Sequence, residues 1–316
     1  MDRPNPDLHP DQTLEAEGEV PVRLMDEKDL PALVSIDRKT SGHDRTEYLT
    51  EKFSACVREP GLNTSLVAEV DGHPVGFLMG RLFFGEFGLP SARAVLDTLG
   101  VHPNFQRRHV GMALLNQYQR NMMALRVEAI DTLVDWDRFG LISFFREAGF
   151  QPSRDVDLEW DLKKYPFQGR DTGVRFRQAW EADLERVTQI DAAAVQTART
   201  AYFTAKHAAA SSRPERNLFL VADLDGEVAG FLVARLFTGE FGIDETRGVI
   251  EAFAVAEPFG HRGIASGMVQ HLQGWLEEKN IQRMETLVRW NNWDLLRFFE
   301  YIGYRPSSRI NLEWRF

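Results

Sequence analysis

The order of apolar and polar positions along this chain predicts an alternation of strands and helices that occurs twice. Stretches with every second position apolar indicate strands, and stretches with apolar positions three and four apart indicate helices. In the first half the expected elements are strands at 22–24, 66–70, 75–83, 94–101 and 130–134, helices at 29–38, 44–57, 108–124 and 141–148, and a closing pair of strands between 150 and 162. Asp71-Gly72 is typical of a two-residue hairpin turn, and Asp29 can act as a helix N-cap. Mixed strands with helices on both faces indicate a layered α/β domain.

The second half repeats the first. A shift of 154 residues brings the two halves into register without a gap, so that LVAEVDGHPVGFLMGRLFFGEFG (66–88) lies over LVADLDGEVAGFLVARLFTGEFG (220–242). A repeat of this length is a whole domain. We therefore predict the following division of the chain: a disordered leader over 1–20, a first domain over 21–163, a linker over 164–173 and a second domain over 174–316. Duplicated domains commonly reuse a self-complementary surface, so we expect an internal pseudo-dimer.

Composition and charge narrow the class of protein. The 316 residues are 43% hydrophobic and 27% charged, with a net charge of −10. Binding nucleic acid requires a concentrated basic face, so we expect no such partner. No apolar run reaches the roughly 18 residues of a membrane helix, so we expect no membrane segment either. The single Cys56 excludes an internal disulfide and has no metal-ligating neighbour, which favours a cytoplasmic protein without a metal.

Two related stretches join a strand to the long helix of each half. They read VLDTLGVHPNFQRRHVGMALL (95–115) and VIEAFAVAEPFGHRGIASGMV (249–269). A small-residue turn at a helix N-terminus lets backbone N–H groups approach a phosphate closely. Both stretches resemble the central motif of the GNAT (Gcn5-related N-acetyltransferase) superfamily, in which a strand ending in Val and a Pro-containing turn precede Q/R-x-x-G-x-G/A. The late F-F-x-x-x-G-[FY] of each half is also similar to this family, so the resemblance covers nearly all of both halves.

The resemblance implies two tandem GNAT-like domains, each a mixed, mostly antiparallel sheet flanked by helices. It also implies acetyl-CoA as the acyl donor, with the pyrophosphate in the turn and the pantetheine arm where two strands splay apart. The coenzyme-binding positions carried over to the second half are Phe253, Val255, His261, Arg262, Gly263, Ile264, Ala265, Ser266 and Asn292. Those carried over to the first half are Leu99, Val101, Arg107, Arg108, His109, Val110, Gly111 and Met112.

The two halves depart from the family motif differently. In the first half His109 replaces the first glycine, and its side chain is expected to crowd the phosphates. The second half has Gly263 and Ala265 at the small positions, although Gly260 replaces the leading Gln or Arg. Asn292 matches a family asparagine that contacts the coenzyme, where the first half has Arg138. We therefore expect the second half to be the better coenzyme site, the alternative being that both halves are active.

Catalysis by this family requires a base for the attacking amine and an acid for the leaving thiolate. The resemblance suggests Glu251 as the base and Asp97 as its counterpart, the alternative being ordinary strand carboxylates that face solvent. A partly buried carboxylate is expected to have a raised pKa. The family tyrosine that serves as acid is Phe145 in one half and Phe299 in the other, so water alone would assist the thiolate.

Three further pairs of residues recur in both halves. Glu86 and Glu240 lie near the expected acceptor side, although turn chemistry accounts for most of that motif. Tyr48 and Tyr202 fall in the second helix, where core packing is the favoured role, and Trp136 and Trp290 are expected to pack beneath the last helix. The sequence therefore predicts an acetyl-CoA-dependent N-acetyltransferase that acts on a small amine. The alternative is a non-catalytic coenzyme A-binding sensor or scaffold with degenerate GNAT domains.

Overall fold

The computed structural model describes residues 20–57, 63–84, 92–169, 173–238 and 245–316. Within these residues each half runs through the same order of elements. In the first half they are β1 (Val22–Leu24), η1 (Glu27–Asp29), α1 (Leu30–Ser41), α2 (Thr46–Val57), β2 (Leu66–Val70), β3 (His73–Phe84), β4 (Ala92–Val101), η3 (Pro103–Phe105), α3 (Val110–Ala124), β5 (Ala129–Asp135), α4 (Phe139–Glu147), β6 (Gln151–Pro152) and β7 (Asp155–Asp161). In the second half they are β8 (Arg175–Gln178), η4 (Glu181–Asp183), α5 (Leu184–Val195), α6 (Thr200–Ser212), β9 (Asn217–Leu224), β10 (Glu227–Thr238), β11 (Thr246–Val255), η6 (Glu257–Phe259), α7 (Ile264–Glu277), β12 (Arg283–Arg289), α8 (Trp293–Ile302), β13 (Arg305–Pro306) and β14 (Arg309–Arg315).

These elements lie close to the ranges expected from the periodicity, with one local difference at the first helix. Asp29 precedes α1, but its carboxylate does not cap that helix. It accepts hydrogen bonds from the backbone N–H of Asp26 at 2.8 Å and from the Arg23 guanidinium at 2.7 Å. The expected N-cap is therefore part of an ion pair that ties η1 to β1. The predicted leader over 1–20 lies outside the described residues apart from Val20.

Within the described residues the strands form two mixed sheets of seven strands each. Their orders are β1-β2-β3-β4-β5-β14-β6 and β13-β7-β12-β11-β10-β9-β8. Among the strands that the structure describes, only the pairs β4–β5 and β11–β12 are parallel, so each sheet is mostly antiparallel, as predicted. Along β3 alternate side chains pack on opposite faces: Phe77 and Met79 against α1 and α2, and Leu78 against α3. Helices thus cover both faces, as the two-residue period of a strand requires.

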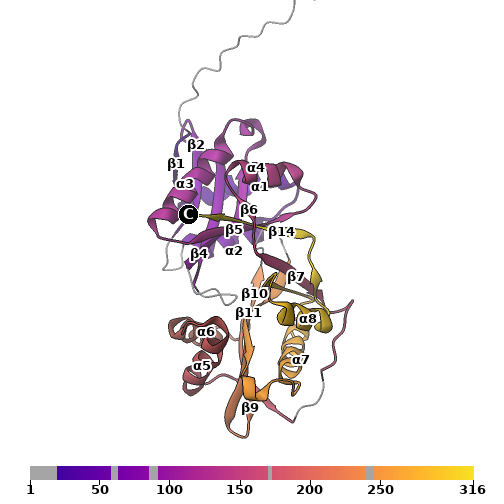
Figure 1. Cartoon of the computed structure of the whole chain (residues 1–316). Coiled ribbons are helices and arrows are strands. Elements are labelled where there is room, and N and C mark those ends of the chain that lie inside the picture. The colour runs from indigo at the N-terminus through magenta and orange to yellow at the C-terminus, as the bar shows by residue number, and fades with distance from the viewer. Residues whose placement is uncertain (1–19, 58–62, 85–91, 170–172, 239–244) are drawn as a thin grey trace, which may run out of the picture.

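The last strand of each half belongs to the sheet of the other half. Strand β14 pairs with β5 along its whole length, from Arg309↔Asp135 to Arg315↔Ala129. Strand β7 pairs in the same way with β12. In Figure 1 the yellow β14 lies among the strands of the first half, while β7 lies beside the orange strands of the second. The two halves are therefore an internal pair joined by exchanged strands, and the sheets cross the domain boundary predicted at residue 163.

An arginine of the host sheet pairs with a glutamate of each exchanged strand, and the pair is buried in the first sheet and partly exposed in the second. In the first sheet the Arg93 guanidinium donates to Asp131 at 2.6 Å and to Glu313 of β14 at 3.1 Å. In the second sheet Arg247 pairs with Glu285 and lies 3.8 Å from Glu159 of β7. These six positions correspond under the 154-residue shift. Removing one partner of such a buried pair is costly, so the ion pairs favour this register over a slipped one.

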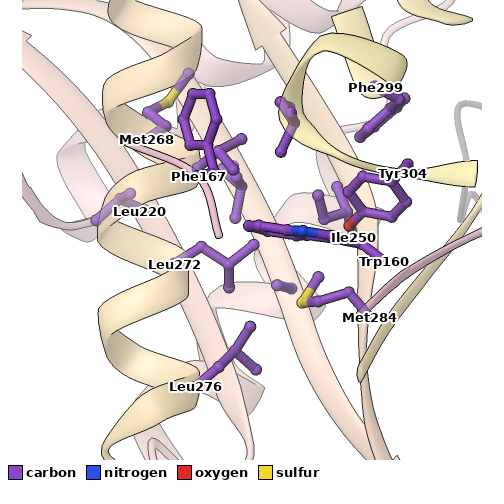
Figure 2. Packing of buried hydrophobic residues seen from close by; sticks show 14 of the residues in the cluster. Trp160, Phe167, Leu220, Ile250, Met268, Leu272, Leu276, Met284, Phe299 and Tyr304 are labelled. Carbon is purple, nitrogen blue, oxygen red and sulfur yellow. The ribbon is translucent and has the colours of Figure 1, made fainter. Parts of the chain in front are cut away.

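The chain between the halves packs on the second half. Tyr165 accepts the indole N–H of Trp160 through its carbonyl oxygen at 2.7 Å, and Phe167 is buried in the same apolar cluster. Figure 2 shows Trp160 and Phe167 among side chains from α7 and α8. The core of the second half therefore contains the exchanged Trp160 and the linker residue Phe167. The predicted linker is in part a structural element, not a free tether.

Candidate active site

In each half the two parallel strands part after a few residues. Strands β4 and β5 pair from Arg93↔Ala129 to Val95↔Asp131, and β11 and β12 pair only at Gly248↔Met284 and Val249↔Glu285. Where this pairing ends, a threonine hydroxyl of the second strand donates a hydrogen bond to the next backbone carbonyl of the first strand. Thr286 donates to the Ile250 oxygen at 3.2 Å, and Thr132 donates to the Leu96 oxygen at 3.0 Å. Beyond these points the strands diverge, which is the splay that the family resemblance predicted.

Glu251 and Asp97 lie where the strand also changes register on its other side. The pairing of β10 with β11 steps from Val233↔Ala252 to Ala234↔Ile250 and passes over Glu251. The pairing of β3 with β4 passes over Asp97 in the same way. A bulge of this kind redirects a side chain and locally twists the strand. Both candidate carboxylates therefore point from the bulge into the layer beneath α2 or α6.

Neither carboxylate faces solvent, because each is enclosed by a lysine and an arginine. Glu251, 1% exposed, lies 2.6 Å from the Lys206 ammonium nitrogen and 2.6 Å from Arg235 Nε. Burial by itself raises the pKa of Glu251, but the charges of Lys206 and Arg235 outweigh it and lower the pKa below the ordinary value. The expectation of a raised pKa is therefore wrong. A carboxylate paired to two cations is a weak base, and the catalytic role of Glu251 stays a prediction.

The same arrangement surrounds Asp97 in the first half. Its carboxylate lies 3.1 Å from Lys52 Nζ and 3.6 Å from Arg81 Nε. We call Lys206, Arg235 and Glu251 the Glu251 cluster, and Lys52, Arg81 and Asp97 the Asp97 cluster. The sequence analysis did not identify these lysines and arginines as site residues, although each occurs at the same position of the repeat. Their recurrence in both halves is the sequence signal that could have identified them.

The burial of the Glu251 carboxylate leads to a prediction about stability. Glu251→Gln should lower the free energy of unfolding at pH 7 by about 3–5 kcal/mol, because two buried cations lose their counter-charge. A pKa lowered by folding stabilises the protein above the unfolded-state pKa, and this stabilisation is lost as the pH falls through the folded-state pKa. Urea unfolding of both proteins should therefore show the difference shrinking below about pH 4.5. A difference that does not depend on pH would contradict the ion pairing.

A cleft of about 680 Å³ opens beside the splay of the second half. It is lined by β11, β12, the start of α8, the end of α5 and the N-cap of α6, and includes Glu251, Phe253 and Asn292 from the predicted site. Arg199, which also lines it, is buried and donates to Asp191 at 2.7 Å. Phe253 stacks on Phe298 with ring centroids 5.4 Å apart. The cleft thus has an apolar side along the strand and a charged wall at the helices.

The predicted phosphate turns have the same backbone in both halves. Gly263, at the N-cap of α7, has φ of 79°, and His261 has φ of 60°. His109 and Arg107 both have φ of 60°. Two left-handed residues before a helix turn successive N–H groups toward one point, which suits a phosphate. His109 adopts a backbone that glycine reaches without strain, so the first half keeps the shape of the turn at some conformational cost.

The first half also has an open cavity at its turn. It measures about 440 Å³ and includes Leu99, Val101, Arg107, His109, Val110, Gly111 and Met112 among its lining residues. Arg108 instead lines a groove on the other side of α3. The His109 side chain is exposed at the edge of this cavity. It narrows the approach to the turn without filling it.

The remaining candidates are placed as follows. Asn292 lines the cleft as the N-cap of α8, and its side-chain oxygen accepts from the Leu295 N–H at 3.2 Å. Phe145 and Phe299 are each 2% exposed, and Tyr301 packs against Phe167 away from the cleft lining. Tyr48 and Tyr202 are buried, which confirms the packing role. Glu86 and Glu240 lie outside the described residues.

The tryptophans were predicted wrongly. Trp136 and Trp290 are 55% and 59% exposed, so they do not pack beneath the last helix. Each lies just after a strand, β5 or β12, at the turn that leads into that helix. Because both tryptophans lie in this turn, their indole rings stay exposed despite their apolar character.

Among the described residues no group of His, Cys, Asp or Glu is arranged for a metal ion. No helix in that part of the chain has the length and apolar character needed to cross a membrane.

Comparison with known proteins identifies the family of the chain. A model of the acetyltransferase (GNAT) family matches residues 30–150 and 178–304, one segment in each half. The two segments together make up most of the chain. The chain therefore belongs to the GNAT family, and it is an acyltransferase of the N-acetyltransferase type.

Individual relatives add detail about the architecture. The chain is similar to an N-alpha-acetyltransferase of Sulfolobus acidocaldarius, with 25% identity over 147 residues, which are 45% of this chain and 85% of that protein. A tandem GNAT protein from the clavulanic acid biosynthesis pathway matches with a TM-score of 0.66 and 15% identity, over 94% of this chain and 98% of the other. A GCN5-related N-acetyltransferase from Sphaerobacter thermophilus matches with a TM-score of 0.61 and 16% identity, over 94% and 96%. The two solved structures share the tandem fold.

Proposed function

We propose that this protein transfers an acetyl group from acetyl-CoA to a small primary amine, chiefly in its second half. The observation that carries the proposal is the junction of a splayed strand pair with a left-handed turn at Gly263, on the N-terminus of a long helix. The splay leaves backbone groups of β11 available to an extended ligand. The turn presents N–H groups and the positive end of the helix dipole to an anion.

The residues present suit acetyl-CoA. Gly263 and the backbone of His261 to Ser266 would hold the pyrophosphate, the β11 residues Phe253 and Val255 would flank the pantetheine arm, and Asn292 would donate to it. When bound, the thioester supplies an activated acyl carbon. The cleft walls then orient the amine and exclude water, which raises the effective concentration of the two reactants. We place this activity in the cytoplasm, because a chain with the single Cys56 suits a reducing compartment.

A non-catalytic role is the second candidate, and one observation favours it. Phe145 and Phe299 occupy the positions of the family acid and are buried, so no phenol hydroxyl is available there to protonate the thiolate. Such a chain would bind coenzyme A as a sensor or scaffold. Catalysis without an acid remains feasible, because a thiolate is a good leaving group at neutral pH.

A panel of primary amines, each incubated with acetyl-CoA and the full-length protein, would test the proposal. We expect at least one amine to accelerate thiol release above the rate of acetyl-CoA hydrolysis, with calorimetry showing coenzyme binding to the same protein. Coenzyme binding that no amine converts into thiol release would favour the sensor. The absence of coenzyme binding would contradict both candidates.

The prediction that Glu251 serves as a base, directly or through a water, is tested on the same substrate. If it does, Glu251→Gln should reduce turnover by a factor on the order of 10²–10⁴ at neutral pH. Part of the rate should return at higher pH, where the amine is already deprotonated; a loss of site geometry alone would not produce this recovery. A pH-independent loss would instead assign Glu251 to the structure of the site.

A further inference from the structure

A buried carboxylate between a lysine and an arginine occurs at the same place in both halves of the chain. Lys52, Arg81 and Asp97 correspond to Lys206, Arg235 and Glu251 under the 154-residue shift. In each cluster the carboxylate side chain is 1% exposed, while the lysine is 10% exposed in one half and 17% in the other. The transfer reaction itself requires none of these cations. Their recurrence beside both splays therefore calls for a physical explanation.

The Glu251 cluster joins three elements at the point where the cleft begins. Lys206 comes from α6, Arg235 from β10, and Glu251 from the bulge of β11. On one side of Glu251 the strand loses its register with β10, and two residues earlier it ends its pairing with β12. Few backbone hydrogen bonds therefore hold β11 at this position. The ion pairs of Glu251 with Lys206 and Arg235 hold the strand there instead.

Helix α6 begins at the wall of the cleft opposite the splayed strand. Its N-cap Arg199 lines the cleft, beside residues from the end of α5, and pairs with Asp191 of α5. Two turns later, in the middle of the helix, Lys206 pairs with Glu251. The helix is thus anchored at its start to the neighbouring helix and at its middle to the bulge. The Lys206–Glu251 contact of 2.6 Å consequently holds α6, and with it Arg199, in place relative to β11.

We propose that Lys206 is a positioning residue whose ion pair with Glu251 fixes α6 against the bulge of β11 and so sets the width of the acyl cleft before a ligand enters. Lys52 holds α2 against the bulge of β4 in the first half through its ion pair with Asp97. This inference rests on the proposed function in that the cleft is taken to receive the thioester.

Energetics support positioning over stability as the reason for the cluster. Burying three charges costs desolvation free energy, and well-packed apolar residues often stabilise a protein as much or more. What an ion pair adds is a fixed distance and direction between the groups that it joins. The halves also differ in a way that fits this role. Asp97 is one methylene shorter than Glu251, and its distances of 3.1 and 3.6 Å are longer than the two 2.6 Å contacts of Glu251.

The test begins with Lys206→Met in the full-length protein. This variant keeps the Arg235–Glu251 pair, so the fold should survive. In the coenzyme-free protein we expect faster hydrogen exchange confined to peptides covering residues 249–255 and 283–289. We also expect acetyl-CoA affinity, measured by calorimetry, to fall about tenfold, the usual size of coupling between linked positions. The urea midpoint of the whole protein should change little.

Three matched variants complete the series. Arg186→Met breaks an exposed ion pair of 3.0 Å between Arg186 of α5 and Glu227 of β10, and should leave both readouts unchanged. Lys52→Met should accelerate exchange in residues 95–101 and 129–135 of the first half only. Glu251→Asp gives the second half the shorter side chain of the first, so its effect should lie between those of wild type and Lys206→Met.

Two results would overturn the inference. Unchanged local exchange together with unchanged acetyl-CoA affinity in Lys206→Met would show that the lysine positions nothing. Destabilisation spread evenly over the second half would show that it is only structural. If the wild-type protein fails to bind acetyl-CoA, the proposed function is wrong. The exchange data on the coenzyme-free protein would still decide whether Lys206 holds the strand.

Discussion

Gly263→Trp is expected to weaken coenzyme binding at least a hundredfold, which corresponds to roughly 2.7 kcal/mol. Two physical effects combine at this position. The backbone φ of 79° is one that a tryptophan adopts only under strain, and the indole would stand where the turn presents its N–H groups. Isothermal titration with acetyl-CoA measures the loss. If the turn is the phosphate site, no change far from it should reproduce this effect.

The same helix supplies a control. Gly274, further along α7, has open space where a side chain would stand, so Gly274→Trp should leave the affinity unchanged. In the first half His109→Gly should improve binding, because it relieves a left-handed backbone and opens the edge of the cavity. Normal binding by Gly263→Trp, together with a loss in Gly111→Trp, would place the main coenzyme site in the first half instead.

Removal of residues 309–316 is expected to unfold the first half, although these residues are the end of the second. The deletion takes away the whole of β14, including the buried Leu312 and the Glu313 partner of Arg93. Loss of a buried leucine costs about 2–5 kcal/mol, and a broken buried ion pair costs about 3–5 kcal/mol. Together these approach the entire stability of a typical domain, about 5–15 kcal/mol.

Hydrogen exchange measured for individual peptides would report how this deletion changes amide protection in each half separately. Protection should collapse in residues 92–101 and 129–135. It should fall less in β12, where Glu285 loses its ion pair with Arg309 but the strand keeps its partners β7 and β11. A synthetic peptide of residues 308–316, added in excess, should restore the protection of the first half. Selective loss in the second half would show that β14 stabilises its own half and not the partner.

Local patterns predicted the repeat, the elements and the turn, because each depends on residues close together in the sequence. The Asp71-Gly72 hairpin and the left-handed Gly263 are examples in which a few residues determine the backbone. The strand exchange depends on partners far apart. LEW at 158–160 and LEW at 312–314 are identical, so their apolar pattern fits either sheet equally well. Only the three-dimensional connection of the halves decides which sheet each one joins.

In the candidate site, too, the features that depend on nearby residues were predicted and those that depend on distant residues were not. Glu251 was found from its place on the strand, but the sign of its pKa shift was not, because burial alone raises a carboxyl pKa and the opposing cations come from other elements. Lys206 lies on α6 between exposed positions of that helix, where a lysine usually faces water. Its burial follows from the bulge that turns Glu251 toward it, and a register shift of this kind leaves no mark in the residue pattern.

The exchanged strands also determine the order in which the protein can be completed during synthesis. The ribosome makes the first half early, yet that sheet needs β14, which is translated after all the other described strands. Until then β5 has an open edge, and such edges promote association between nascent chains. The second half has no such delay, because β7 is already present when β12 emerges. Chaperone dependence should therefore arise from the half that is translated first.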